Sequence, residues 1–208
     1  MPAFAQGLHF GIKAGVPFTD YFETGLGPGD YSAATRRYVA GATGEWQWRE
    51  SIGFEVDALF HRMGYVAIVD TFNDSTGVLS HSAIDVKGDS WDVPLLVKYR
   101  FGRRLSPYAV AGGVLRYAGP VRGLGQQTVT NLITRTTVTI PLDTSDPSEL
   151  RKRFYPGVTA GGGIEFRIPH LRLQPEVRYT RWTANISAEG GLLRYPANQV
   201  EFLLGVVF

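Results

Sequence analysis

Two groups of residues in this chain have types and spacing that could support catalysis. Ser80-His81-Ser82 stands near Asp85, which places hydroxyls, an imidazole and a carboxylate within six residues, and His61 is a second candidate base. A histidine must face the hydroxyl that it deprotonates, but successive residues of an extended chain point to opposite sides. We therefore interpret His81 as a solvated loop residue and predict that the protein is not an enzyme.

Motifs for metals and cofactors are incomplete. Asp70-Thr71-Phe72-Asn73-Asp74 begins like a calcium loop, but Phe72 stands at a ligand position and no glutamate closes the twelve-residue frame. The chain has no cysteine, which excludes disulfides, thiolate zinc sites and cysteine nucleophiles. We predict no metal and no cofactor.

The composition indicates a folded protein rich in β-structure. Of 208 residues, 44% are hydrophobic and 19% charged, and the net charge of +2 is too small to indicate nucleic-acid binding. The 25 glycines, 12 phenylalanines, 10 tyrosines and 4 tryptophans argue against disorder and against a helical bundle. No apolar run approaches the roughly 18 residues of a transmembrane helix, so only a β-barrel could span a membrane.

The N-terminus carries a weak export signal. Ala3-Phe4-Ala5 before Gln6 fits the A-x-A pattern of a signal-peptidase site. We interpret residues 1–5 as the remnant of a signal-peptide cleavage region and residues 6–208 as a single domain.

Eight segments alternate apolar and polar residues with a period of two, which predicts strands with one face of each kind. They cover residues 8–16, 38–48, 52–61, 91–101, 108–115, 158–168, 171–179 and 199–208. No helical period competes over a useful length. Eight amphipathic strands close naturally into an all-β, antiparallel, up-and-down barrel.

The two faces differ sharply in charge. We assign no charged residue to the apolar face. The polar face carries seven acids and six bases: Glu45, Glu55, Asp57, Asp92, Glu165, Glu176, Glu201, Lys13, Lys98, Arg100, Arg167, Arg172 and Arg178. We also assign four leucines to this face: Leu59, Leu96, Leu115 and Leu203.

Residue size indicates that the polar face points inward. The apolar face carries Trp46, Trp48 and Trp91, and also Trp182 if the alternation slips after Tyr179. If this face pointed inward, these large side chains would overfill a small barrel. Glycines on the polar face suit the crowded concave side. In a transmembrane barrel the apolar face meets lipid, with aromatic girdles at both interfaces. The predicted girdle residues are Tyr38, Trp48, Trp91, Tyr99, Phe101 and Tyr108.

Connection lengths support the same interpretation. Short turns at 49–51, 102–106 and 169–170 alternate with long loops at 18–37, 62–90, 119–153 and 184–198. Outer-membrane barrels have short periplasmic turns and long extracellular loops, so both termini are predicted to be periplasmic. The Thr-rich segment 126–140 is β-prone and predicts a hairpin above the membrane.

The chain resembles the eight-stranded bacterial outer-membrane barrels of the OmpA/OmpX-like group. The resemblance covers residues 6–208 and rests on the Gly-rich opening 7–15, on Ser106-Pro107-Tyr108 and on the closing Phe208. It implies recognition of the last strand by the barrel-assembly machinery, through the alternating residues Phe202, Leu204, Val206 and Phe208. It further implies contact with outer-membrane lipid and lipopolysaccharide. Unlike OmpA, the barrel is expected to have no peptidoglycan-binding domain after it.

The inward charges favour a closed lumen over a channel, because poorly hydrated charges must pair. We expect a monomer with a structural or surface-interaction role and an extracellular ligand at the long loops. Three alternatives stay open: a narrow ion-conducting pore, a lipid-modifying enzyme such as the lipid A deacylases that resemble this fold, and a soluble lipocalin-like carrier.

Two prolines interrupt predicted strands. Pro94 and Pro175 lack the N–H that a central strand donates, and a closed barrel has no edge to accommodate them. We therefore predict a β-bulge at each, with a register shift of one residue beyond it.

Overall fold

The computed structural model describes residues 7–19, 23–24, 30–33, 37–102, 105–145, 153–183, 193–194 and 197–208. Residues 1–5, interpreted above as a signal-peptide remnant, lie outside these ranges. Every regular element in the described ranges is a β-strand. None of these residues forms a helix long and apolar enough to cross a membrane.

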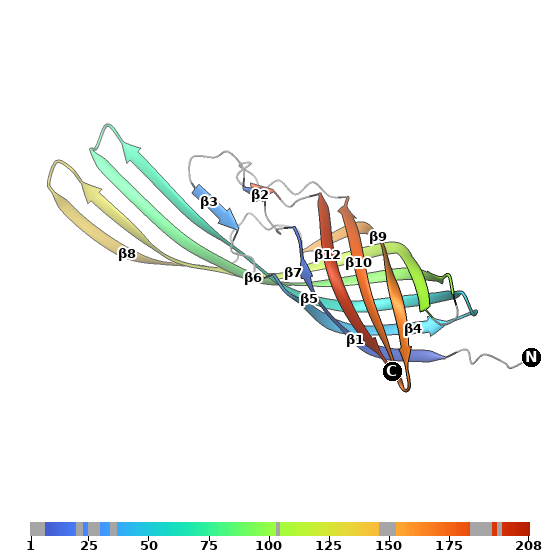
Figure 1. Ribbon diagram of the computed structural model, residues 1–208. Helices are drawn as coiled ribbons and strands as arrows, with labels where there is room; N and C mark the ends of the chain where they lie inside the picture. The colour runs from blue at the N-terminus through green and yellow to red at the C-terminus, as the bar shows by residue number, and fades with distance from the viewer. Residues whose placement is uncertain are drawn as a thin grey trace, which may run out of the picture.

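Eight of the described strands form a closed ring (Figure 1). They are β1 (Leu8–Pro17), β4 (Val39–Gln47), β5 (Ile52–Asn73), β6 (Val78–Arg100), β7 (Leu105–Asn131), β9 (Phe154–Ile168), β10 (Leu171–Trp182) and β12 (Asn198–Val207). Each pairs antiparallel with the next, and β12 pairs with β1 from Gly11↔Val207 to Pro17↔Glu201, which closes the ring. The predicted eight-stranded antiparallel barrel is confirmed.

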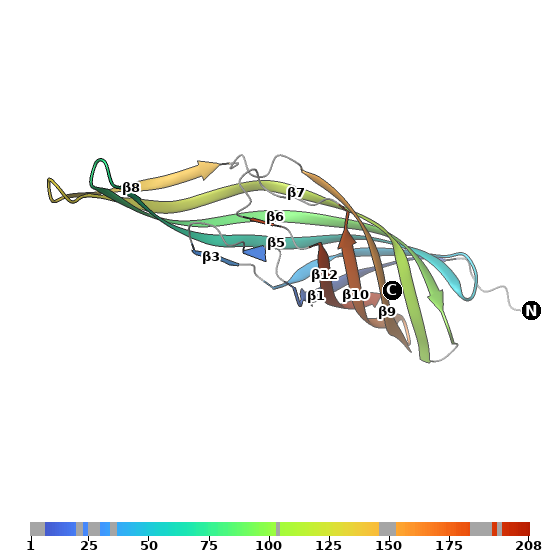
Figure 2. The same cartoon turned by 90° about the horizontal axis from the view of Figure 1, so that it is seen from above.

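Three strands continue far beyond the ring. The outer parts of β5, β6 and β7 join β8 (Thr136–Ser145) in a four-stranded sheet that projects from one end of the barrel (Figures 1 and 2). We call this the projecting sheet, and its end of the barrel the distal end. The start of β1 and the end of β12 lie at the opposite end of the barrel, which we call the terminal mouth (Figure 1).

Short strands accompany the projecting sheet. β3 (Asp30–Ala33) pairs with β5 at the base of the sheet, from Asp30↔Ile68 to Ala33↔Tyr65. β2 (Glu23–Thr24) pairs with β11 (Leu193–Arg194), and within the described ranges neither pairs with another strand.

The projecting sheet corrects the predicted long loops. Residues 62–90 and 119–145 are mostly strand, and the hairpin tips are short turns at 74–77 and 132–135. Near the tips both faces of the sheet meet solvent, so the sequence there lacks the apolar-to-polar alternation that reveals a half-buried strand. The hairpin predicted within 126–140 is confirmed by the pairing of β7 with β8.

The ring is apolar outside and polar inside. On β1, Phe10 and Ile12 are 63% and 61% exposed, whereas Lys13, the residue after Ile12, is 1% exposed. A water-soluble barrel would show the reverse, because burial of apolar area drives folding in water. The predicted face assignment holds for β1, β4, β5, β6 and β12.

Strand β7 reverses the predicted faces. Tyr108, Val110 and Val114 are buried in the lumen, and Leu115 is 44% exposed on the outside. The segment 109–113 contains only small residues and one valine, so it has no contrast between faces, and pairing with β6 and β9 decides the parity. The assignments of Tyr108 to the girdle and of Leu115 to the lumen were therefore wrong.

The end of β10 also differs from expectation. The alternation continues past Tyr179 without a slip, so Thr180 and Trp182 both point inward and Trp182 is 6% exposed. The indole ring of Trp182 lies under the guanidinium of Arg116, 4.1 Å from the ring centroid. A buried aromatic–cation contact accounts for a tryptophan inside the barrel.

The predicted bulges at the two prolines are absent. Pro94 pairs with Val114 and Pro175 with Leu204 in unbroken register, and the irregularity of β6 against β7 lies at Gly88/Ser90 instead. Pro94 interrupts the pairing of β6 with β5, and Pro175 interrupts the pairing of β10 with β9. Each of these two ladders lacks two successive residue pairs and then resumes in the same register. A lost donor thus removes local hydrogen bonds without displacing the strand.

Candidate functional site

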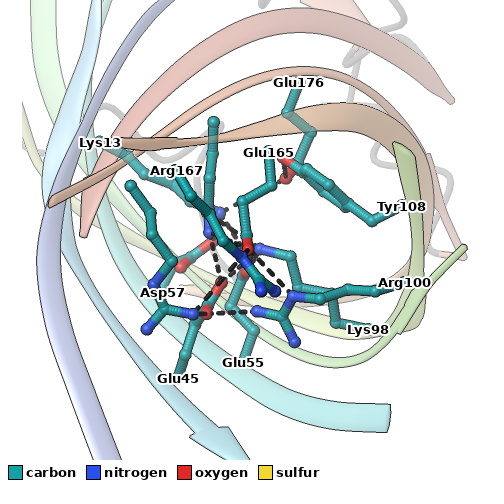
Figure 3. Close-up of polar contacts among 12 residues, drawn as sticks. Lys13, Glu45, Glu55, Asp57, Lys98, Arg100, Tyr108, Glu165, Arg167 and Glu176 are labelled. Atoms are coloured by element: carbon teal, nitrogen blue, oxygen red, sulfur yellow. Dashed lines mark hydrogen bonds and ion pairs between the residues drawn. The ribbon is translucent and has the colours of Figure 1, made fainter. Parts of the chain in front are cut away.

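Charged side chains from all around the ring converge inside the lumen (Figure 3). Of the thirteen residues predicted to face the lumen, eleven are buried, Arg172 is half-buried and Arg167 is exposed. The period of two positions them, because every second residue of each strand points inward. Their contacts divide them into three layers along the barrel axis.

The central layer contains three cations and three acids. Glu55 accepts hydrogen bonds from Lys13, from Lys98 at 2.9 Å and from Arg178 at 3.2 Å. Asp57 lies 3.3 Å from the Lys13 ammonium and 3.0 Å from Arg178. Formal charges cancel within this layer, which is the condition for keeping ionised groups in a poorly hydrated interior.

Glu176 completes the central layer. Its carboxylate accepts a hydrogen bond from Arg178 Nε at 2.7 Å, and the Lys13 ammonium lies 3.6 Å away. The Tyr108 hydroxyl donates to Glu176 at 3.0 Å, and the Lys98 ammonium lies over the Tyr108 ring, 4.1 Å from its centroid. Tyr108 therefore belongs to the lumenal network, although the sequence pattern had predicted it on the outer face.

The second layer lies at the terminal mouth and is built on two carboxylates. Glu45 accepts from Lys98, from Arg100 at 2.6 Å and from Gln174 at 3.0 Å. Glu165 accepts from Arg100 at 3.0 Å, from Gln174 at 3.1 Å and from Arg167 at 2.8 Å. Arg100 and Gln174 therefore bridge the two acids.

The third layer lies toward the distal end and centres on Arg116. Its guanidinium donates two parallel hydrogen bonds to Asp92, both 2.7 Å long, and a third to Gln199 at 2.8 Å. His61 Nε2 lies 3.2 Å from Asp92. Glu201 is 5% exposed, and its Oε2 has no hydrogen-bond partner among the described residues.

Arg116 is the main residue that sequence reasoning missed. The predicted strand ended at Leu115, so Arg116 was assigned to neither face, whereas β7 continues to Asn131 and turns Arg116 inward. The charge count indicated that one lumenal base was missing, because seven predicted lumenal acids faced only six bases. With Arg116, seven cations face the seven acids that line the described lumen.

Apolar side chains lie between and beyond the charged layers. Val39, Leu59 and Leu203 form a buried cluster next to the central layer. A larger cluster sits at the distal end of the ring and at the base of the projecting sheet: Met63, Tyr65, Ala67, Val86, Val114, Ala118, Val121, Tyr155 and Trp182.

The candidate catalytic residues do not form a triad. His81 Nδ1 lies 2.6 Å from Asp70 on the neighbouring strand, but Ser80 and Ser82 point to the other face of β6. Asp85 binds Lys87 at 2.5 Å instead. Within the described residues, no three His, Asp or Glu side chains are arranged to hold a metal ion.

Replacing Tyr108 with phenylalanine tests the inward position of this ring. The variant keeps the ring packed and removes the hydroxyl that donates to Glu176. We expect the free energy of unfolding to fall by about 1–3 kcal/mol, the cost of leaving a buried acceptor without its donor. Urea unfolding of the refolded protein measures it, with Tyr99→Phe on the outer face as the control. Equal effects of the two changes would place Tyr108 outside.

Aromatic side chains form bands on the outer surface. Toward the distal end, Phe60, Trp91, Tyr117 and Phe154 are direct cross-strand neighbours on four successive strands. Toward the terminal mouth, exposed aromatic rings form the other band: Trp46, Trp48, Phe54, Tyr99 and Phe101. Two aromatic bands with exposed aliphatic residues between them are the surface of a transmembrane β-barrel.

A family model for the outer membrane protein β-barrel domain matches residues 4–199. The chain belongs to this family of outer-membrane β-barrels. Membership agrees with the apolar outer surface and identifies the barrel as a protein of the bacterial outer membrane. A search of the curated proteins finds no match.

Solved structures of outer-membrane proteins resemble the chain at low sequence identity. The Ail attachment invasion locus protein of Yersinia pestis is 12% identical, with 97% of each chain covered and a TM-score of 0.43. Neisserial surface protein A is 14% identical, covering 96% of this chain and 94% of that one, with a TM-score of 0.44. OprG of Pseudomonas aeruginosa is 14% identical, covering 97% and 94%, with a TM-score of 0.48.

Proposed function

We propose that this outer-membrane barrel is a non-conducting, non-enzymatic anchor that presents its projecting sheet to partners outside the cell. The observation that carries the proposal is the sheet itself. β5, β6 and β7 continue for ten or more residues beyond the ring, and strands rise about 3.3 Å per residue. The sheet therefore extends roughly 30–40 Å from the barrel.

The edge strand of the sheet suits binding of other polypeptides. β8 pairs with β7 on one side, and among the described residues no strand pairs with its other side. Residues 136–142 carry no charge, and the side chains Val138 and Ile140 are exposed. An unpaired, uncharged edge is a template to which an extended peptide adds a strand.

The lumen supports anchoring better than transport. The ionised groups of the central layer contact one another directly, and apolar clusters lie beside them and at the distal end. An ion would have to separate buried pairs and cross apolar layers, so the network closes the barrel and the narrow-pore alternative is disfavoured. The carrier alternative needs apolar side chains inside the ring, where charged ones lie.

Orientation and assembly follow the general pattern of outer-membrane barrels. Both termini and the short turns are periplasmic, and the projecting sheet is extracellular. The C-terminal strand presents Phe202, Leu204 and Phe208 on the outer surface, where the barrel-assembly machinery reads them before the strand closes onto β1. The protein is a monomer whose outer surface contacts lipid and, in the outer leaflet, lipopolysaccharide.

Single cysteines test this orientation, because the chain has none of its own. Ile133 lies at a tip of the projecting sheet and is 75% exposed, whereas His170 lies in the turn between β9 and β10 at the terminal mouth. On intact cells, a membrane-impermeant maleimide should label Ile133→Cys and spare His170→Cys until the outer membrane is permeabilised. The reverse labelling would place the sheet in the periplasm and overturn the proposal.

Measurements of ion conductance test whether the lumen is closed. The wild-type protein, reconstituted in planar lipid bilayers, should show no stepwise conductance. Regular single-channel steps in the wild type would favour the narrow pore and reject the closed lumen.

An ion pair on the projecting sheet gives a pH prediction. Arg122 donates hydrogen bonds of 3.1 and 2.7 Å to Asp143, which lower the pKa of this carboxyl below its ordinary value. The pair therefore supports the β7–β8 hairpin above the ordinary pKa, and this support is lost as the pH falls through the lowered pKa. In NMR titrations we expect Arg122→Gln to raise the Asp143 midpoint toward the ordinary value, while Arg62→Gln leaves it unchanged. An unchanged midpoint in Arg122→Gln would show that the pair does not form.

A further inference from the structure

Among the described side chains that line the lumen, those at the terminal mouth include more cations than acids. The two carboxylates of the mouth, Glu45 and Glu165, serve the three guanidinium groups of Arg100, Arg167 and Arg172, and Glu45 also accepts from Lys98. The central layer, in contrast, pairs three cations with three acids. The excess positive charge is therefore local to the mouth.

The strand register concentrates this charge. Arg167 on β9 and Arg172 on β10 are direct cross-strand partners, and like charges in such positions destabilise a sheet unless an anion lies between or beside them. Arg167 reaches Glu165 at 2.8 Å, but the contacts of Arg172 are long, 3.4 Å to Glu45 and 3.9 Å to Glu165.

One guanidinium nitrogen of Arg172 lacks a hydrogen-bond acceptor among the described residues. This nitrogen, Nη2, is buried, although an unsatisfied buried donor of a charged group is costly. The nearby carboxylates are already largely engaged, because Glu45 accepts from four donors and Glu165 from three. The side chains of Arg167 and Arg172 are 43% and 13% exposed, so Arg167 is the more accessible of the two from the mouth.

We propose that Arg167 and Arg172, supported by Arg100, form a binding site for a phosphate-class oxyanion at the terminal mouth. Guanidinium groups bind such anions through paired N–H donors, and an anion here would satisfy Arg172 Nη2 and neutralise the excess charge. The anion is either free phosphate or the phosphate of a lipid headgroup in the adjacent leaflet. The site is independent of the projecting sheet and of its partners.

Inorganic phosphate is the first probe. The protein is refolded in dodecyl maltoside, which carries no phosphate, and its thermal unfolding is followed by heat-modifiable gel migration against phosphate, with chloride at matched ionic strength. In the wild type we expect a saturable rise of the midpoint, and at ten times the dissociation constant the unfolded-to-folded ratio falls about tenfold. Arg172→Gln should raise the dissociation constant about tenfold to a hundredfold.

A matched control separates binding from a general salt effect. Arg49 lies in the β4–β5 turn at the same mouth, is exposed and stacks on Trp48, so Arg49→Gln makes the same charge change outside the lumen. It should respond to phosphate as the wild type does. If Arg172→Gln does not refold, Arg167→Gln takes its place, because the Arg167 side chain is already largely solvated.

A second arm identifies the source of the anion. The same proteins are reconstituted in vesicles of digalactosyldiacylglycerol, a lipid without phosphate, with and without phosphatidylglycerol. Stabilisation by inorganic phosphate supports a free anion, and stabilisation by phosphatidylglycerol alone supports a lipid headgroup, provided that Arg172→Gln abolishes either effect. No stabilisation by either probe, or an equal response in Arg172→Gln, overturns the proposal.

Discussion

Replacing Glu55 with glutamine should lower the free energy of unfolding by about 3–5 kcal/mol, the typical cost of removing one partner from a buried ion-pair network. Glu55 is fully buried and contacts Lys13, Lys98 and Arg178 at once. Glutamine keeps the shape of the side chain but leaves three cations facing two acids in the central layer. Desolvated positive charge then opposes folding.

Urea unfolding of the protein in lipid vesicles measures the effect, and two further variants identify its cause. Glu50→Gln, in the exposed turn after β4, should change stability by no more than about 0.5 kcal/mol. Adding Lys98→Gln to Glu55→Gln should recover part of the loss, with a coupling energy of about 1–3 kcal/mol, because the two groups contact directly. Additive effects would mean that the central layer is hydrated and its charges independent.

Replacing Leu95 with arginine should destabilise the folded barrel by about 2–4 kcal/mol, the cost of a cation at the midplane of a lipid bilayer. Leu95 is 60% exposed on the outer face of β6, midway between Trp91 of one aromatic band and Tyr99 of the other. In water, the same substitution on an exposed surface would have almost no effect.

Leu124 is the matched control for this prediction. It is 52% exposed and lies on the continuation of the same outer face, but in the projecting sheet beyond the aromatic band. Leu124→Arg should change the free energy of unfolding in vesicles by no more than about 0.5 kcal/mol. Similar losses in the two variants would show that exposure alone, and not contact with lipid, sets the cost.

Much of the fold was predictable because residue types alternate along a strand whose two faces meet different surroundings. Wherever one face of a strand meets lipid and the other lines the lumen, residues such as Phe10 and Lys13 must alternate. The pattern therefore predicted the eight strands, the order in which they close and the face that points outward. It failed where the surroundings of the two faces are alike, as in the tips of the projecting sheet, or where residues are too small to differ, as in 109–113.

The lumenal charges illustrate the limit of such reasoning. A strand pattern predicts that Glu55, Lys98 and Arg178 face inward, but their partners come from other strands and depend on register and barrel closure. Arg116 shows this dependence, since only its pairing with β6 and β9 turns it toward Asp92. The orphaned nitrogen of Arg172 is likewise a property of the assembled mouth.

Local patterns were enough to predict the class of protein, a closed antiparallel barrel with lipid outside and charge inside, because period and charge are properties of each strand. The lengths of β5, β6 and β7, the inward face of β7 and the division of the lumenal charges into layers became apparent only in the folded chain. These features depend on cross-strand register, in which residues distant along the chain become neighbours. No local pattern encodes that proximity.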